Sequence, residues 1–516
     1  MRYEIPFLKN ECWWGGSTAY GCENPFTEES VFEADYRRKA LNQTMPLFLS
    51  DKGRYLWSEH PFYVRIESGM FVFEGEDIQV IQAGSCLRDA YIAAKNTHFP
   101  FDGKELPESF FKTAQYNTWM EFTYDPTQEG VLAYAHDIIK NGLKPGILII
   151  DEGWHGRYGT WAFDKAKFPD PAKMIKELHE LGFIVMLWIV PLVCPDGREF
   201  IINIDKVTYG GKSGKRFIRN EKGDVALFDW WNGYSAMLDF TNPEDYQFLD
   251  EQLKHLINDY GVDGFKFDGG SLTMYHPDNI INGPANADMD PVVLNKAWND
   301  FGRRYPYHEY KDTFKGGGLN CIQRLSDRNH AWSPNGIDTL IPCSVLQGLM
   351  GHPFICPDMI GGGEWSYNIK PGFQVDQELF VRMAQASALF PMMQFSWAPW
   401  KALDEKHWDM VKAAADLHEE MADEIIQMVK TAEINGEPIL RNLEYNFPGC
   451  GYATIKDEFM LGETILAAPV VTANTYEREV VFPAGNWQDQ DGTIYSGPQT
   501  IKVKAPIEKL LWFRKK

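Results

Sequence analysis

The sequence lacks the short motifs through which many proteins bind metals or nucleotides or activate a serine. Its eight cysteines are scattered without a CxxC pair, which argues against zinc sites and disulfides and predicts buried free thiols. No HxH or HExxH spacing occurs, the glycine runs at 316–318 and 361–363 lack the helix signature of a phosphate-binding loop, and no GxSxG elbow appears. We therefore expect an activity that needs no metal and no cofactor.

The sequence also lacks the features of a membrane protein or a nucleic-acid-binding protein. No apolar run reaches the roughly 18 residues of a membrane-spanning helix, and the first residues, MRYEIPFLKNECWW, contain no apolar core of a signal peptide. The net charge of −22 disfavours nucleic acid and anionic membrane surfaces as partners. These absences predict a cytoplasmic protein that acts on a neutral small molecule. They do not decide whether the protein forms a homo-oligomer.

The length and composition predict a large globular protein, since 516 residues, 44% of them hydrophobic, suffice for about two to four domains. Residues 1–105 alternate in short aromatic-rich segments, with a hairpin at 62–66 and 70–74, and predict an antiparallel β-sandwich. Residues 106–430 alternate strands with helices, and residues 431–516 return to short strands separated by turn residues. We expect a barrel domain between two sandwich domains.

The alternation of strands and helices in residues 106–430 favours a (β/α)8 barrel, because this pattern is typical of parallel sheets covered by helices. Asp170 with Pro171, and Asn242 with Pro243, have the capping pattern of a helix start. Residues 196–233 are too long for an ordinary loop and predict an insertion near the active face of the barrel. The candidate strands are 113–119, 146–151, 183–190, 264–268, 307–311, 320–327, 353–360 and 392–396, and the candidate helices are 129–141, 170–182, 242–260, 292–303, 376–389 and 404–430.

The string GVDGFKFDGG, at residues 261–270, is a short apolar strand that ends in two glycines. Because side chains alternate along a strand, Lys266 and Asp268 share one face and the two phenylalanines share the other. A carboxylate at the carboxyl end of a barrel strand lies where barrel enzymes keep their reacting groups, and a neighbouring lysine favours its ionised, nucleophilic form. A structural ion pair is the alternative interpretation of the same ten residues.

Aspartates recur at the carboxyl ends of the predicted barrel strands. Any single one could be a helix N-cap, but several at equivalent ends indicate a shared active site. Clustered acids also suit a divalent cation, yet Lys266 and Arg324 would supply the balancing charge, so we expect no metal. The strand-end aspartates are Asp151, Asp268, Asp327 and Asp358, with Asp239 before the fourth strand.

Paired carboxylates among aromatic side chains are the design of glycoside hydrolysis. In the retaining form the two carboxyl groups lie about 5–5.5 Å apart; one attacks the anomeric carbon, and the other protonates the leaving oxygen and then activates water. A tryptophan taken alone is more typical of a core than of a sugar platform, and Trp231 and Trp397 are the stronger platform candidates. The other candidate tryptophans are Trp119, Trp154, Trp188 and Trp365.

Motifs spread over nearly the whole chain resemble glycoside hydrolase family 31, a family of retaining α-glycosidases. The resemblance implies a (β/α)8 barrel flanked by N-terminal and C-terminal sandwiches, and a small carbohydrate as substrate. The motifs follow the family's order and are MPLFLSDKGRYLWSEHPF (45–62), WAFDKAKFPDPAKMIKELHELGFIVMLWIVPLV (161–193), WWNGYSAMLDFTNPE (230–244), GFKFDGG, RLSDRNHAW, PDMIGGGEW, ELFVRMAQASALFPMM (378–393) and FMLGETILAAPVV (459–471).

The resemblance also implies roles for single residues. Asp268 matches the family's nucleophile and Asp327 its acid/base, while Asp358, the rival acid, matches a residue that holds substrate. Asp151 matches a carboxylate that binds hydroxyls of the terminal sugar, and Trp231 matches an aromatic side chain of that subsite. The predicted site therefore has Asp268 and Asp327 as catalytic residues and Asp151, Trp154, Trp188, Trp231, Lys266, Lys311, Arg324, Asp358 and Trp397 as substrate-binding residues.

Departures from the glucosidase branch of the family indicate a different sugar. Lys266 replaces the tryptophan of that branch's WxDMNE motif, and Ser271 follows the glycine pair after the nucleophile. Lys311 takes the place of an arginine, and Ser396 the place of a histidine. The KxD form, together with PDMIGG, resembles the branch with α-galactosidase activity, which is our first expectation. An α-N-acetylgalactosaminidase, an α-glucosidase or α-xylosidase, and a non-catalytic carbohydrate-binding homologue are the alternatives.

Overall fold

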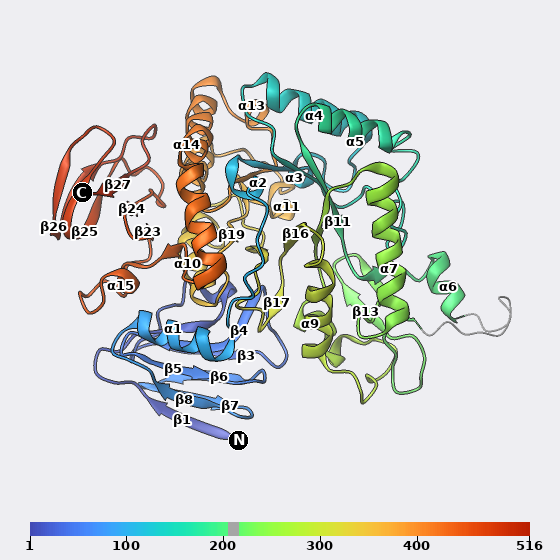
Figure 1. Ribbon diagram of the computed structural model, residues 1–516, viewed down its shortest axis with the longest axis horizontal. Coiled ribbons are helices and arrows are strands. Elements are labelled where there is room, and N and C mark those ends of the chain that lie inside the picture. Colours follow the sequence, from blue (N-terminus) through green and yellow to red (C-terminus); the bar gives the residue numbers. More distant parts are fainter. Residues whose placement is uncertain (205–215) are drawn as a thin grey trace. The chain divides into compact units, whose positions relative to one another are not determined.

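The computed structural model describes residues 1–204 and 216–516, so residues 205–215 of the predicted insertion lie outside it (Figure 1). The described residues form two units. The first unit comprises Met1–Arg37, Asn42–Gln115 and Lys315–Lys516, and the second comprises Arg38–Leu41 and Tyr116–Phe314. Within these described ranges, no helix has both the length and the apolar character that crossing a membrane requires.

The second unit is built on a parallel sheet of buried strands. Leu148, in the strand Ile147–Ile150, lies in register with Val185 on one side and Tyr116 on the other. Every residue of that strand, ILII, is buried, as expected for parallel strands covered on both faces. The strand order is β16 (Tyr307–Tyr310), β15 (Gly264–Phe267), β11 (Ile184–Ile189), β10 (Ile147–Ile150), β9 (Gln115–Asn117).

Helices of the second unit begin at the caps that the sequence predicts. The Asp170 side chain accepts a hydrogen bond from the Lys173 amide, and the Asn242 side chain accepts one from the Glu244 amide, each with a proline next in the chain. The predicted helices are confirmed as α4 (Gln128–Lys140), α5 (Pro171–Glu180), α7 (Pro243–His255), which continues in a π-helical turn at Leu256–Tyr260, and α9 (Pro291–Gly302).

Part of the predicted insertion forms a small antiparallel sheet in the second unit. The strands β13 (Leu227–Trp230) and β14 (Gly233–Met237) form a hairpin, and β14 also pairs with β12 (Leu192–Val193). Phe228 and Met237 of the hairpin share a core with Trp188 of β11. This core holds the hairpin near the carboxyl end of β11. The helix α6 (Arg198–Ile204) precedes the undescribed residues.

The first unit contains two pairs of short parallel strands, and helices of ten residues or more lie between and after them in the chain. The strand β18 (Ile322–Arg324) pairs with β19 (Ile355–Cys356), and β20 (Met359–Ile360) pairs with β21 (Gln394–Phe395). Each of the eight predicted barrel segments thus contains a strand. The helices are α10 (Leu340–Leu349), α12 (Gln377–Ala388) and the long α14 (Glu405–Asn435), orange in Figure 1; the sequence predicts the last two at 376–389 and 404–430.

Antiparallel sheets form the N-terminal and C-terminal parts of the first unit. The predicted hairpin at 62–66 and 70–74 is confirmed, and Phe48 of one N-terminal sheet lies 5.7 Å from Phe73 of the other, measured between ring centroids. The N-terminal sheets are β1 (Arg2–Pro6), β7 (Met70–Glu74), β6 (Tyr63–Glu67), β3 (Phe32–Asp35), and β4 (Gln43–Ser50), β5 (Arg54–Trp57), β8 (Gln79–Gln82) with β2 (Trp13–Ser17) on β4. The C-terminal strands form one sheet in the order β22 (Leu440–Arg441), β23 (Phe459–Leu461), β24 (Ile465–Ala467), β27 (Trp512–Lys515), β25 (Glu477–Gln488), β26 (Ile494–Lys504). The first unit also contains α1 (Leu87–His98), α2 (Ser109–Lys112), α11 (Trp365–Asn368), α13 (Pro399–Ala402) and α15 (Leu443–Asn446). The second unit also contains α3 (Trp119–Phe122), α8 (Leu272–Tyr275) and β17 (Thr313–Phe314).

The first residue of β15, Gly264, allows the backbones of β15 and β16 to approach closely. A Cβ atom at this position would lie 2.1 Å from the Tyr307 carbonyl oxygen. We therefore expect Gly264→Ala to force the two strands apart and to lower the free energy of unfolding by about 1–3 kcal/mol. Urea unfolding measures the change. Gly156→Ala is the control, because its added Cβ would meet nothing closer than 3.7 Å; equal stability of the two variants would contradict the prediction.

Candidate active site

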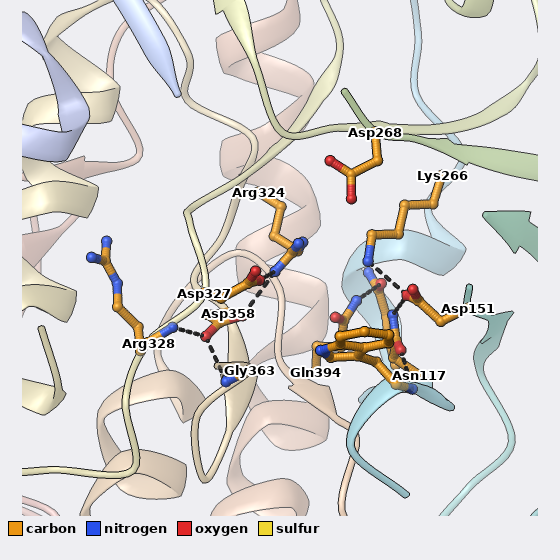
Figure 2. A network of polar contacts seen from close by, with 12 residues as sticks. Asn117, Asp151, Lys266, Asp268, Arg324, Asp327, Arg328, Asp358, Gly363 and Gln394 are labelled. Atoms are coloured by element: carbon orange, nitrogen blue, oxygen red, sulfur yellow. Dashed lines mark hydrogen bonds and ion pairs between the residues drawn. The ribbon is translucent and has the colours of Figure 1, made fainter. Parts of the chain in front are cut away.

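A buried ion pair joins the ends of β10 and β15 in the second unit. Lys266 Nζ lies 2.6 Å from Asp151 Oδ2, and the two side chains are only 4% and 3% exposed. Asn117, at the end of β9, donates its Nδ2 to the same oxygen over 2.7 Å (Figure 2). The backbone amide of Glu152 donates to Asp151 Oδ1. Asp151 therefore has a fixed orientation with both of its oxygens engaged.

Asp268, directly after β15, is also held by hydrogen bonds to both carboxylate oxygens. Trp188 Nε1 donates to Oδ2 over 3.0 Å, and the Gly269 amide donates to Oδ1 over 2.8 Å. The sequence suggests Lys266 as the neighbour that acts on Asp268. The structure differs, because the long Lys266 side chain reaches past β11 and forms its ion pair with Asp151. Both predicted residues therefore belong to one cluster, but through different contacts.

The glycines after Asp268 let the chain turn sharply away from the carboxylate. Gly270 has φ of +66°, a conformation that favours glycine, and a Cβ atom there would lie 2.5 Å from Trp298 Cδ1. Ser271 then caps α8, since its Oγ accepts a hydrogen bond from the Met274 amide. The Gly-Gly-Ser sequence thus has a local role in presenting Asp268.

Glu152 is a buried carboxylate in this cluster that is not among the predicted site residues. Its Oε1 accepts hydrogen bonds from the Tyr158 hydroxyl and from Asn232 Nδ2. Burial, and then the charges of Asp151 and Asp268, raise the pKa of Glu152 to about 7, although the Tyr158 hydrogen bond opposes this. The signal in the sequence is the pair of adjacent acids that ends the apolar run GILIIDE.

A second cluster of charged residues lies in the first unit. Arg324 Nη1, at the end of β18, is 2.9 Å from Asp327 Oδ1 and 2.8 Å from Asp358 Oδ1 (Figure 2). The Asp327 side chain is 25% exposed, whereas that of Asp358 is 0% exposed. One guanidinium thus orients two carboxylates, of which only Asp327 is accessible to solvent.

Asp358 is held in a strained conformation between β19 and β20. Its φ is +140°, which few residues other than glycine adopt. Its Oδ2 accepts hydrogen bonds from the Arg328 and Gly363 amides. Burial, and the charge of Asp327, raise the pKa of Asp358 to about 6, while Arg324 opposes the shift. Strain of this kind is found where the surrounding structure fixes a functional residue.

The predicted aromatic residues fall into different environments. Trp154 is fully buried and donates its Nε1 to the Trp188 carbonyl, so it supports the Asp268 cluster from within the core. Trp231 is 51% exposed at the turn of the β13–β14 hairpin. Trp397, after β21, is partly buried and lies 5.3 Å from His330 between ring centroids.

Three other predicted positions also have defined places. Lys311 is half-buried immediately after β16, and Ser396 is buried immediately after β21. Asp239 has a different setting from Asp151, since its Oδ1 accepts hydrogen bonds from Thr241 and it lines a cavity of about 600 Å³ with Arg219 and Asp288. Within residues 1–204 and 216–516, no three His, Cys, Asp or Glu side chains converge as a metal-binding group.

Comparisons with known proteins agree on one family. Residues 107–428 match the model described as the glycosyl hydrolases family 31 TIM-barrel domain, and residues 436–516 match the glycosyl hydrolase family 31 C-terminal domain. The first match confirms the predicted barrel, and with it the fold class of a barrel accompanied by antiparallel sheets.

Individual relatives and solved structures are also similar to this chain. The chain is 31% identical over 406 residues to the myogenesis-regulating glycosidase of Mus musculus, covering 77% of this chain and 55% of that protein. It is 25% identical over 424 residues to alpha-glucosidase 2 of Bacillus thermoamyloliquefaciens, covering 76% and 51%. The chain thus spans about half the length of these relatives. A family 31 dextranase of Flavobacterium johnsoniae, solved with glucose, has the same fold, with a TM-score of 0.82, 18% identity and coverage of 100% of this chain and 66% of that one.

Proposed function

Because the chain belongs to glycoside hydrolase family 31, we propose that it is a retaining exo-α-glycosidase that removes terminal α-linked sugars, with an α-galactoside as its preferred substrate. Two sets of observations support this proposal. The first is the pair of oriented aspartates at the ends of β15 and β18, and the second is the Lys266–Asp151 ion pair. We also propose the domain limits 1–105, 106–430 and 431–516, which the matched regions 107–428 and 436–516 support.

The proposed mechanism has two displacements. Asp268 attacks the anomeric carbon while Asp327 gives its proton to the departing oxygen, so the glycosidic bond breaks as a bond to the Asp268 carboxylate forms. Asp327 then removes a proton from water, which attacks the same carbon and releases Asp268 and the sugar with its original configuration. The Trp188 and Gly269 hydrogen bonds aim the nucleophile and limit its motion.

The observation that favours galactose is the lysine at position 266. In the glucosidase branch a tryptophan occupies this position, whereas here an ammonium group is buried against Asp151, the carboxylate proposed to bind sugar hydroxyls. A donor and an acceptor fixed 2.6 Å apart suit two neighbouring hydroxyls such as those at C3 and C4, of which the C4 hydroxyl is axial in galactose and equatorial in glucose. An α-glucosidase or α-xylosidase is the second candidate, because the relatives include an alpha-glucosidase and an alpha-xylosidase.

Lys266→Met tests the sugar-binding role of the ion pair. Removing the ammonium group leaves Asp151 buried without its cationic partner, and we expect kcat/KM for 4-nitrophenyl α-galactoside to fall about 100- to 1,000-fold. Release of nitrophenol from the α-galactoside, α-N-acetylgalactosaminide, α-glucoside and α-xyloside measures both the preference and its loss.

Lys509→Met is the control, because this lysine forms an ion pair with Asp489 and Asp491 in the C-terminal sheet region. It should leave the kinetics unchanged. Faster hydrolysis of the α-glucoside than of the α-galactoside by the unmodified protein would overturn the galactose preference. If folded protein hydrolysed none of the four glycosides, the proposed glycosidase activity itself would be wrong.

A further inference from the structure

Glu152 and the β13–β14 hairpin form a polar cluster beside the Asp151–Lys266 pair. Glu152 follows Asp151 directly and is 3% exposed. Tyr158 and Asn232 both donate to its Oε1, and Asn232 Nδ2 also lies 2.8 Å from the Tyr158 hydroxyl. These two hydrogen bonds fix the carboxyl group in place through Oε1.

An exposed tryptophan adjoins this carboxyl group. Trp231 is 51% exposed, and its side chain also forms a hydrogen bond with Glu152. It rests on Trp230, with ring centroids 4.9 Å apart, and Trp230 is anchored by a 3.0 Å hydrogen bond from its Nε1 to Ser235. A large exposed ring held on a rigid hairpin offers an apolar face beside fixed hydrogen-bonding groups.

Glu152 has negatively charged neighbours, which is unusual for a buried carboxylate whose only role is to stabilise a fold. Asp151 and Asp268 face it with the same sign of charge, and Lys266 bonds to Asp151. His155, which packs on Tyr158, has its pKa lowered to about 4 by burial and is neutral near pH 7. Within the described part of the chain, Glu152 forms no ion pair with a lysine or arginine. Burying such a group costs stability, which a purely structural position would avoid.

We propose that Glu152 is a specificity-determining residue that binds a hydroxyl of a neutral sugar, in a subsite completed by Asn232 and the exposed ring of Trp231. This inference rests on the proposed function and names further residues that recognise its substrate. Carbohydrates present C–H faces that stack on an indole and hydroxyls that donate to a carboxylate. Trp231 supplies the stacking face and Glu152 the hydrogen-bond acceptor at one place. The hydrogen bonds from Tyr158 and Asn232 orient the Glu152 carboxylate before the sugar binds.

Direct binding of free sugars tests the subsite without requiring turnover. Isothermal titration of the full chain with galactose, glucose and xylose should detect at least one of them. Glu152→Gln should weaken that affinity about 10- to 100-fold, because a hydrogen bond to a charged acceptor is lost. Asn232→Ala, at the hairpin turn, should weaken it several-fold and serves as the second variant if Glu152→Gln does not fold. Glu458→Gln is the matched control, since Glu458 is another buried carboxylate whose pKa is raised to about 7 by burial, in the C-terminal sheet region.

The pH dependence provides an independent readout. Only the ionised carboxylate is a strong acceptor, and with a pKa near 7 for Glu152 the affinity should rise between pH 6 and pH 8. The Glu152→Gln variant should lose this rise, and Glu458→Gln should keep it.

The binding and hydrolysis measurements distinguish a failure of the Glu152 subsite from a failure of the proposed hydrolytic function. A sugar that binds the unmodified protein and Glu152→Gln equally, with the same pH profile, would overturn the subsite even if the α-galactoside were hydrolysed. Absence of any sugar binding would overturn it as well. Binding that depends on Glu152, in a protein that hydrolyses none of the four nitrophenyl glycosides, would support the subsite and refute the hydrolytic function.

Discussion

Asp268→Ala should lower kcat for 4-nitrophenyl α-galactoside by about 10⁴-fold or more. The methyl group cannot attack the anomeric carbon, so no covalent glycosyl-enzyme forms and the reaction loses its first displacement. The loss should appear in kcat, because the variant leaves unchanged the Asp151–Lys266 pair, which we propose to bind the sugar. Steady-state release of nitrophenol, with folding checked by circular dichroism, measures the effect.

Added azide distinguishes a missing nucleophile from a damaged site. In Asp268→Ala the azide ion can take the space of the carboxylate, attack the anomeric carbon from the same side and displace nitrophenolate, so the product should be the β-glycosyl azide. Asp263→Asn is the control, because Asp263 precedes β15 at the opposite end of the strand and accepts the Val185 amide there. Substantial turnover by Asp268→Ala without azide, or an α-glycosyl azide as product, would contradict the nucleophile assignment.

The barrel strands could be predicted from the sequence because their signal is local. A parallel strand covered on both faces is a continuous apolar run, and GILIID and FIVMLWIV stand out as such runs among the more polar segments around them. The helix starts at Asp170 and Asn242 are equally local, since the cap and its partner amide lie within three residues. The carboxyl ends of the strands then indicate which aspartates belong to a site.

The contacts within the site could not be predicted, because they join residues far apart in the chain. Strand alternation places Lys266 on the same face as Asp268, but it does not indicate that β10 brings Asp151 to the ammonium group from 115 residues away. The sequence pattern misses Glu152 for the same reason, since its partner Asn232 lies 80 residues further on, in a hairpin of the predicted insertion. The strained φ of Asp358 has no counterpart in sequence pattern at all.

Exposure to solvent and pKa favour different aspartates as the acid/base. Burial raises the pKa of Asp358 to about 6, which suits a proton donor. However, its side chain is 0% exposed and its oxygens bond to Arg324, Arg328 and Gly363. An acid/base must reach the leaving oxygen in one step and water in the next. The 25% exposed Asp327 can do both, whereas Asp358 is better placed to fix Arg324.

Asp327→Ala should therefore show a loss of activity that depends on the leaving group. Methyl α-galactoside needs a proton on its departing oxygen, and we expect its kcat/KM to fall about 10²- to 10⁴-fold, the usual contribution of general acid catalysis. 2,4-Dinitrophenyl α-galactoside departs without protonation, so its kcat/KM should fall less than about tenfold. The ratio of the two losses, measured on the same protein preparation, isolates the proton transfer from any general damage to the site.

Asp358→Asn is the matched comparison, because it alters the other carboxylate bound to Arg324. It should reduce hydrolysis of both substrates by a similar factor, since it disturbs the position of Arg324 and the loop at Arg328 rather than a proton transfer. If Asp358→Asn discriminated between the two leaving groups and Asp327→Ala did not, the roles of the two aspartates would be exchanged. In that case the raised pKa of Asp358 would identify it as the proton donor. The partly exposed Asp327 would then contribute to substrate entry instead of proton transfer.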